Sequence, residues 1–124
     1  MLVVEDSEDT LMLLSAIFRN KGANVITAAS AAEALQSAKD RRPDVVISDI
    51  GMPDVDGYEF LKQLKKLPGL GDVPAIAVSG YASDEDRQRA LSVGYLTLVP
   101  KPVDVDVLFE LFHDLKPPRP AKKV

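Results

Sequence analysis

The chain has no cysteine and only one histidine, His113. The lack of cysteine excludes disulfide scaffolds, thiolate nucleophiles and zinc sites built from thiolates, and a lone histidine excludes a histidine-rich metal site. No apolar run approaches the roughly 18 residues that a membrane-spanning helix needs, so we expect no membrane association. The segment from Met1 to Asp6 has neither the basic region nor the long apolar core of a signal peptide. We therefore expect a cytoplasmic protein.

The composition that remains is typical of one soluble globular domain. The 124 residues are 46% apolar and 27% charged, with a net charge of −4, which allows a core large enough for independent folding. The acidic balance disfavours binding to nucleic acid. Residues 116–124 contain three prolines, three lysines and one arginine. We therefore assign residues 1–115 to the domain and residues 116–124 to an extended, basic C-terminal tail or linker.

Short β-branched runs alternate with longer amphipathic segments, which predicts an α/β fold with a parallel sheet. The predicted strands are Leu2–Val4, Asn24–Ala28, Asp44–Ser48, Ala75–Ser79 and Leu96–Val99. The predicted helices cover about residues 7–21, 30–41, 57–67 and 84–93, and Asp104 opens a fifth with an inward stripe of Leu108, Leu111, Phe112 and Leu115. Right-handed crossovers then predict a single (βα)5, doubly wound, flavodoxin-like sheet with strand order 2-1-3-4-5.

Polar side chains lie at the ends of four predicted strands. The pair Glu5-Asp6 follows the first strand, Asp49 follows the third, Ser79 ends the fourth and Lys101 comes just after the fifth. Ligands of open α/β sheets bind at the carboxyl ends of the strands, beside the switch point that this strand order places between strands one and three. Three acids, a hydroxyl and an amine at this edge indicate phosphoryl chemistry.

This set of residues resembles the receiver domain of two-component response regulators. The resemblance extends from Met1 to about Leu115 and is carried by four pieces: Glu5-Asp6, the segment Asp49-Ile50-Gly51-Met52-Pro53 with Gly57 beyond it, Ser79-Gly80 and Lys101-Pro102. Each piece alone is weak evidence, because an aspartate shortly before Met-Pro occurs by chance. All four in order, at strand ends and with matching separations, are specific.

The resemblance implies that Asp49 is a phosphoacceptor, a carboxylate that attacks phosphorus and forms an acyl phosphate. Lys101 would contact a phosphoryl oxygen as a point charge. Ser79 would donate a hydrogen bond to the phosphoryl group once it is present. By the same resemblance, the peptide bond before Pro102 would be cis and would aim the lysine inward.

The resemblance also implies a Mg²⁺ site, with Mn²⁺ as an alternative ion. Its ligands would be the carboxylates of Glu5, Asp6 and Asp49 and the backbone carbonyl of Gly51. Carboxylates gathered in one crevice repel one another, which raises their pKa values. A hard divalent cation relieves that repulsion and takes oxygen ligands. An N-cap of the first helix is a second role, open to Asp6 or Ser7.

The implied function is a switch that receives phosphate from a histidine kinase or a histidine phosphotransfer protein. Such a domain is not an enzyme acting on an outside substrate, since it catalyses only its own phosphorylation and dephosphorylation. Phosphorylation would alter the face made by the fourth helix, the fifth strand and the fifth helix. A homodimer, if one forms, would use this same face.

Two aromatic residues raise questions that the resemblance does not answer. In many receivers an aromatic residue three positions before the lysine changes rotamer as the hydroxyl moves, but this chain has Leu98 there. Tyr95 lies three residues earlier and cannot be assumed to replace it. Tyr81, two residues after Ser79, either restricts access to the site or lies flat on the surface.

Two other functions are weighed against the receiver. A phosphatase of the haloacid dehalogenase type also uses a strand-end aspartate, but it carries a second aspartate two residues later, where this chain has Gly51. A degenerate receiver that serves only as a protein-interaction module would lack some of the site residues. All of them are present here.

Overall fold

A computed structural model describes residues 1–52, 55–80 and 82–115 and, within the last helix, no side chain of residues 105 and 112–115. Several predictions therefore lie outside the described residues. They concern Tyr81, Pro53, the linker at 116–124, and the inward side chains of Phe112 and Leu115. Ten elements alternate strictly between strand and helix. They are β1 (Leu2–Val4), α1 (Glu8–Asn20), β2 (Ile26–Ala28), α2 (Ala31–Asp40), β3 (Val46–Asp49), α3 (Gly57–Lys65), β4 (Ala75–Ser79), α4 (Asp84–Val93), β5 (Leu98–Pro100) and α5 (Val105–Leu115).

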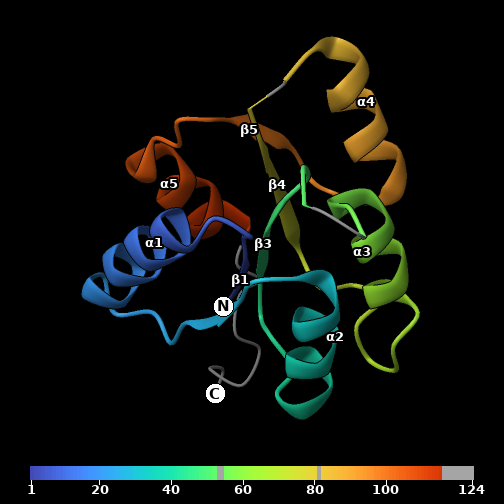
Figure 1. The fold of residues 1–124 in the computed structure, drawn as a ribbon, viewed down its shortest axis with the longest axis horizontal. Coiled ribbons are helices and arrows are strands. Elements are labelled where there is room, and N and C mark those ends of the chain that lie inside the picture. The colour runs from blue at the N-terminus through green and yellow to red at the C-terminus, as the bar shows by residue number, and fades with distance from the viewer. Residues whose placement is uncertain (53–54, 81, 116–124) are drawn as a thin grey trace.

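The five strands form one parallel sheet in the order β2-β1-β3-β4-β5, which confirms the predicted topology. Helices α1 and α5 cover one face of the sheet, and α2, α3 and α4 cover the other (Figure 1). Each face has its own apolar core. Phe18 of α1 is buried on the first face, and Phe60 of α3 is buried on the second. The sheet is therefore covered on both sides, as parallel sheets are in α/β proteins.

Side-chain caps explain why four of the helices begin where they do. The side chains of Ser7, Ser30, Asp56 and Ser83 each accept a hydrogen bond from the backbone N–H three residues further on. Such a cap satisfies one of the amide groups that have no partner within the helix. The sequence predicted the caps at Ser30 and Ser83, left the first cap open between Asp6 and Ser7, and missed Asp56.

The regular strands are shorter than predicted at three places. Strand β2 begins at Ile26 rather than Asn24, although the carbonyl of Asn24 accepts a hydrogen bond of 2.9 Å from the N-terminal ammonium of Met1. Strands β3 and β5 begin two residues later than predicted. The residues just before these two strands still bond to neighbouring strands: the N–H of Leu2 donates to the Val45 carbonyl, and the N–H of Leu96 donates to the Ala75 carbonyl. The apolar pattern in the sequence therefore extends beyond the regular strands.

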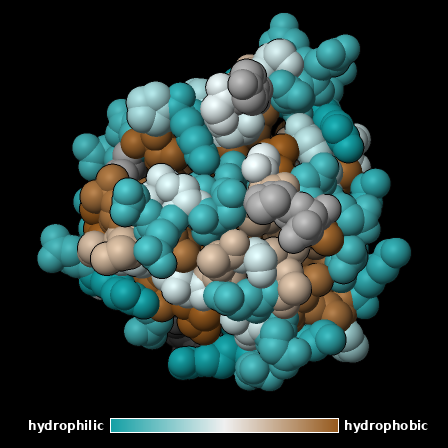
Figure 2. Space-filling model, in the orientation of Figure 1, coloured by the Kyte–Doolittle hydropathy of each residue, from teal (hydrophilic) through white to brown (hydrophobic). Residues whose placement is uncertain are grey.

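The surface visible in Figure 2 has a mixed distribution of polar and apolar side chains. In the view of Figure 2, hydrophilic side chains cover most of the surface, and apolar side chains appear in separate patches. Of the helices that the structure describes, none combines the length and the apolar character that crossing a bilayer requires.

Candidate functional site

The carboxyl ends of the strands bring the predicted polar residues to one edge of the sheet. Val4 at the end of β1 pairs with Ser48 of β3, so Glu5 lies beside Asp49, the last residue of β3. Asp49 in turn pairs with Val78 of β4, and Ser79 pairs with Pro100 of β5. The register of four strands thus places all the predicted site residues at the same edge.

Three carboxylates converge there from β1 and β3. Oxygen atoms of Glu5, Asp6 and Asp49 all lie within 4.8 Å of one another. Glu5 and Asp49 are buried, with exposed fractions of 2% and 5%, whereas Asp6 is exposed. Ser7 supplies the cap of α1, so the Asp6 carboxylate is not needed for that role. A set of oxygen ligands with one side open to solvent fits a hard divalent cation that keeps some of its water.

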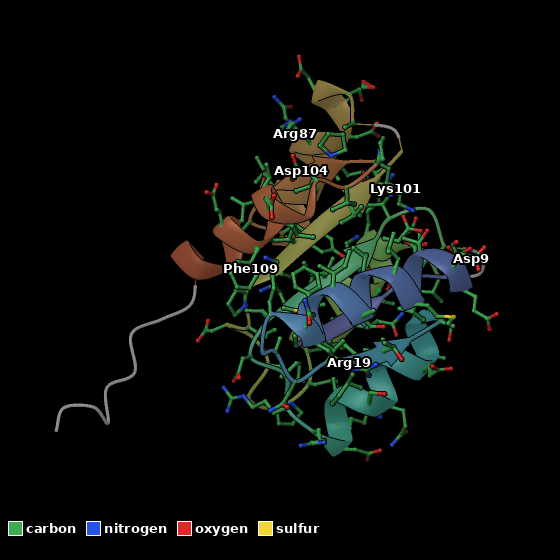
Figure 3. The ribbon with its side chains drawn as sticks, turned by 90° about the vertical axis from the view of Figure 1, so that its left-hand side faces the viewer. Asp9, Arg19, Arg87, Lys101, Asp104 and Phe109 are labelled. Carbon is green, nitrogen blue, oxygen red and sulfur yellow. The ribbon has the colours of Figure 1, made fainter. Side chains whose placement is uncertain are left out.

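Lys101 supplies the positive charge of the cluster. Its Nζ atom lies 3.0 Å from Oε1 of Glu5 and 3.4 Å from Oδ1 of Asp49. The peptide bond between Lys101 and Pro102 is cis, as the resemblance implied. Figure 3 shows Lys101 toward the end of the molecule where α1 begins, marked by Asp9, and away from Arg19 near the other end of that helix.

Burial and neighbouring charges both alter pKa values within this cluster. Burial raises the pKa of Glu5 to about 7, and the nearby charge of Asp49 adds to this effect. Hydrogen bonds from Lys101 and from the backbone of Ser7 oppose the rise without cancelling it. Burial also acts to lower the pKa of Lys101, but the two carboxylates outweigh it and the pKa of the ammonium is raised. Additional positive charge would therefore stabilise the ionised form of Glu5.

The other two predicted residues lie close to this cluster. Ser79 is buried at the end of β4, and its carbonyl accepts a hydrogen bond of 2.8 Å from the backbone N–H of Lys101. Gly51 lies two residues beyond Asp49, and its backbone N–H donates to Oδ1 of Asp49 at 3.2 Å. Every residue predicted for the site is thus at the same sheet edge, although their roles in chemistry remain predictions.

Two buried polar residues beneath the site were not predicted. Ser48 is fully buried one position before Asp49, and the Tyr95 side chain is 2% exposed. The signal for Ser48 was available, because it is the one polar residue that β3 carries before Asp49. Tyr95 was named from the sequence only as an aromatic residue that cannot be assumed to replace the usual one, and no signal indicated that its side chain is buried beneath the site. Leu98, at the position where many receivers carry an aromatic residue, is also buried and has an apolar side chain.

Comparisons with known proteins agree with the geometry. A family model described as the response regulator receiver domain matches residues 1–113. The polar-differentiation response regulator DivK of Brucella anthropi is 33% identical over 109 residues, which cover 88% of this chain and 89% of DivK.

Solved structures give the same result. The Vibrio cholerae chemotaxis protein CheY4 superposes with a TM-score of 0.88 at 31% identity, covering 92% of this chain and 95% of CheY4. A chain in the CheX-CheY-BeF3-Mg²⁺ complex of Borrelia burgdorferi superposes with a TM-score of 0.81 at 32% identity, covering 91% of this chain and 86% of the other.

Proposed function

The chain belongs to the response regulator receiver domain family, and from this premise we propose that Asp49 is the residue that becomes phosphorylated. The observation that supports this assignment best is the contact of Lys101 with Asp49, 3.4 Å between Nζ and Oδ1, beside two further carboxylates. Among the carboxylates of this cluster, Asp49 is the one at the centre of the sheet edge. A phosphoryl group added there would meet the ammonium at once.

The proposed reaction is an in-line displacement at phosphorus. A carboxylate oxygen of Asp49 forms a bond to phosphorus as the bond from phosphorus to the donor breaks, and the donor, an imidazole nitrogen in a phosphohistidine, leaves with the electron pair. Lys101 holds one phosphoryl oxygen by charge. Ser79, buried at the end of the neighbouring strand, donates a hydrogen bond to another oxygen.

The proposed ion is Mg²⁺, or Mn²⁺ in its place, held by Glu5, Asp6, Asp49 and the backbone carbonyl of Gly51. The donor set supports this choice, since carboxylate oxygens within 4.8 Å of one another are the ligands that hard cations prefer. When bound, the ion supplies positive charge against the phosphoryl oxygens. The pKa of Glu5 is raised, and a bound cation would favour the ionised form of this carboxylate.

The proposed phosphate donor is a histidine kinase or a histidine phosphotransfer protein, met in the cytoplasm. The domain would catalyse only its own phosphorylation and dephosphorylation, because Gly51 stands where a phosphatase with a strand-end aspartate carries its second acid. Residues 1–115 would form this domain, with residues 116–124 as a linker. A homodimer, if one forms, would use the face of α4, β5 and α5.

The proposal is tested by incubating the protein with acetyl phosphate and Mg²⁺ and measuring intact mass. We expect the wild-type protein to gain one phosphoryl group and the Asp49→Asn variant to gain none. Asp44→Asn is a matched control, because Asp44 is an exposed aspartate just before the opposite end of β3, and it should be phosphorylated as the wild type is. An Asp49→Asn protein that gained phosphate at the wild-type rate would refute the assignment.

A further inference from the structure

The hydroxyl of Tyr95 makes a buried contact that links two distant parts of the chain. Tyr95 follows Gly94, the C-cap of α4, and its side chain is 2% exposed. The hydroxyl donates a hydrogen bond of 2.6 Å to the carbonyl of Gly57, the first residue of α3. The backbone N–H of Tyr95 donates to the carbonyl of Ala90 at 3.0 Å, so the residue is fixed to α4 at one end and to α3 at the other.

Gly57 lies directly against the backbone of the proposed phosphoacceptor. Its N–H donates to the carbonyl of Ile50 at 2.9 Å. A Cβ atom at position 57 would lie 2.5 Å from the carbonyl oxygen of Asp49 and 2.8 Å from the Cα atom of Ile50. Those separations leave no room for any side chain. A displacement of Gly57 is therefore transmitted to the peptide bond that follows Asp49.

Ser48, the residue before Asp49, bonds the same Asp49 carbonyl oxygen that lies against Gly57. Its hydroxyl donates to the carbonyl of Asp49 at 3.0 Å, and its side chain is fully buried. Burial raises the pKa of Tyr95, and the nearby Ser48 hydroxyl opposes part of that rise. With its pKa raised, the phenol keeps its proton and remains a donor to Gly57. The Tyr95 hydroxyl thus bonds the carbonyl of Gly57, and the Ser48 hydroxyl bonds the carbonyl of Asp49, against which Gly57 lies.

The residue at the usual aromatic position cannot make such a contact. Leu98 has no polar atom in its side chain and is 1% exposed. Tyr95 brings a hydroxyl to Gly57 from a different position, directly after the C-cap of α4.

We propose that Tyr95 is a positioning residue for the phosphorylation reaction. Its hydroxyl fixes Gly57 against the backbone of Asp49 and Ile50, holds the Asp49 carboxylate in contact with Lys101, and links Gly57 to the C-terminal end of α4. The inference rests on the proposed function of Asp49 and extends it by naming the contact that holds the phosphoacceptor in place.

The test uses Tyr95→Phe, which removes the hydroxyl and keeps the ring. Tyr58→Phe is the matched control. The Tyr58 hydroxyl also joins α3 to α4, through the carbonyl of Asp86 at 3.4 Å, but Tyr58 makes no hydrogen bond to the residues beside Asp49. Rates of phosphorylation are measured over a range of acetyl phosphate concentrations at saturating Mg²⁺. We expect the maximal rate of Tyr95→Phe to fall about tenfold, because a small misplacement of the reacting group has a large effect on rate, while Tyr58→Phe stays within about twofold of wild type.

A second readout separates positioning from loss of stability. In NMR spectra without phosphodonor, Tyr95→Phe should broaden or shift the amides of residues 48–51, and Tyr58→Phe should leave them in place. Ser48→Ala, which removes the other hydroxyl, should slow the reaction as well, and the double variant should be no slower than the worse single variant if the two hydroxyls act together.

The outcomes are distinguishable. If the wild type takes up no phosphoryl group, the proposed function fails and the positioning role fails with it. If the wild type is phosphorylated and Tyr95→Phe matches Tyr58→Phe in maximal rate and in the amides of residues 48–51, the proposed function stands and the positioning role is overturned.

Discussion

Glu5 is a buried acid whose pKa the fold raises. Its carboxylate is 2% exposed and its pKa is raised to about 7 from an ordinary value of 4.5, mainly by burial. An acid with a raised pKa holds its proton more tightly in the folded state than in the unfolded state. Between pH 4.5 and about 7, the free energy of unfolding therefore decreases as pH rises, and the destabilisation is complete above that window.

The first prediction concerns Glu5→Gln in buffer free of divalent cations. Glutamine cannot ionise, so the difference in unfolding free energy between the variant and the wild type should move in favour of the variant as pH rises from about 5 to about 8, by on the order of 2 kcal/mol. The Lys101 ammonium, whose pKa is raised, stays charged throughout. Urea unfolding at a series of pH values measures the effect.

The control for this experiment is Glu8→Gln, which removes an exposed carboxylate from the first turn of α1. It changes the net charge by the same amount away from the cluster. If the two variants followed the same pH course relative to wild type, Glu5 would not be the buried acid described above.

At the scale of elements, the junction between β3 and α3 is the tightest backbone approach to the site. The N–H of Gly57 bonds to the Ile50 carbonyl, and Asp56 caps the helix that Gly57 begins. Only a residue without a Cβ atom lets the first turn of α3 lie against the end of β3.

The second prediction is that Gly57→Ala destabilises the protein by about 2–4 kcal/mol, because the added carbon would lie 2.5 Å from a backbone oxygen that cannot move aside cheaply. Gly71→Ala is the control, since a Cβ atom there meets its nearest neighbour at an ordinary 3.7 Å. The midpoint of urea unfolding, at an unchanged m value, measures the change in stability of each variant. Equal midpoints for the two variants would show that α3 can move away from β3 without cost.

The elements also show what a sequence can and cannot predict. Alternating strand and helix patterns with right-handed crossovers lead directly to the strand order, and polar residues at strand ends lead to Asp49 and Lys101 at one edge. The starts of β2, β3 and β5 were predicted two residues too early. Backbone hydrogen bonds to neighbouring strands continue before each regular ladder, and the apolar pattern does not show where the ladder itself begins.

The contact between Tyr95 and Gly57 was not predictable from the pattern for a different reason. Its partners are 38 residues apart in the sequence. Periodicity describes which face a residue lies on, not which polar atoms meet across the core. The carboxylate cluster was predictable because the sheet register alone brings its members together.

At the scale of the whole molecule, the candidate site depends on the complete sheet. Its residues come from the ends of β1, β3, β4 and β5, and two apolar cores on opposite faces hold those strands in register. An unfolded chain cannot bring Asp6 near Asp49. A cation that binds this cluster therefore binds only the folded state, and binding must raise the stability of the molecule as a whole.

The last prediction follows from that linkage. For an ion present at about 100 times its dissociation constant, the gain in unfolding free energy should be about 2.7 kcal/mol. It should be seen as a higher midpoint of thermal unfolding in Mg²⁺ than in a chelator. Asp6→Asn should lose most of this gain, because Asp6 offers one of the three clustered carboxylates and is exposed, so its removal leaves the core intact. Asp9→Asn, an exposed acid in the first turn of α1, should keep the full gain. If Asp6→Asn gained as much as Asp9→Asn, Mg²⁺ would be acting through general charge screening, and the cluster of Glu5, Asp6 and Asp49 would not be its site.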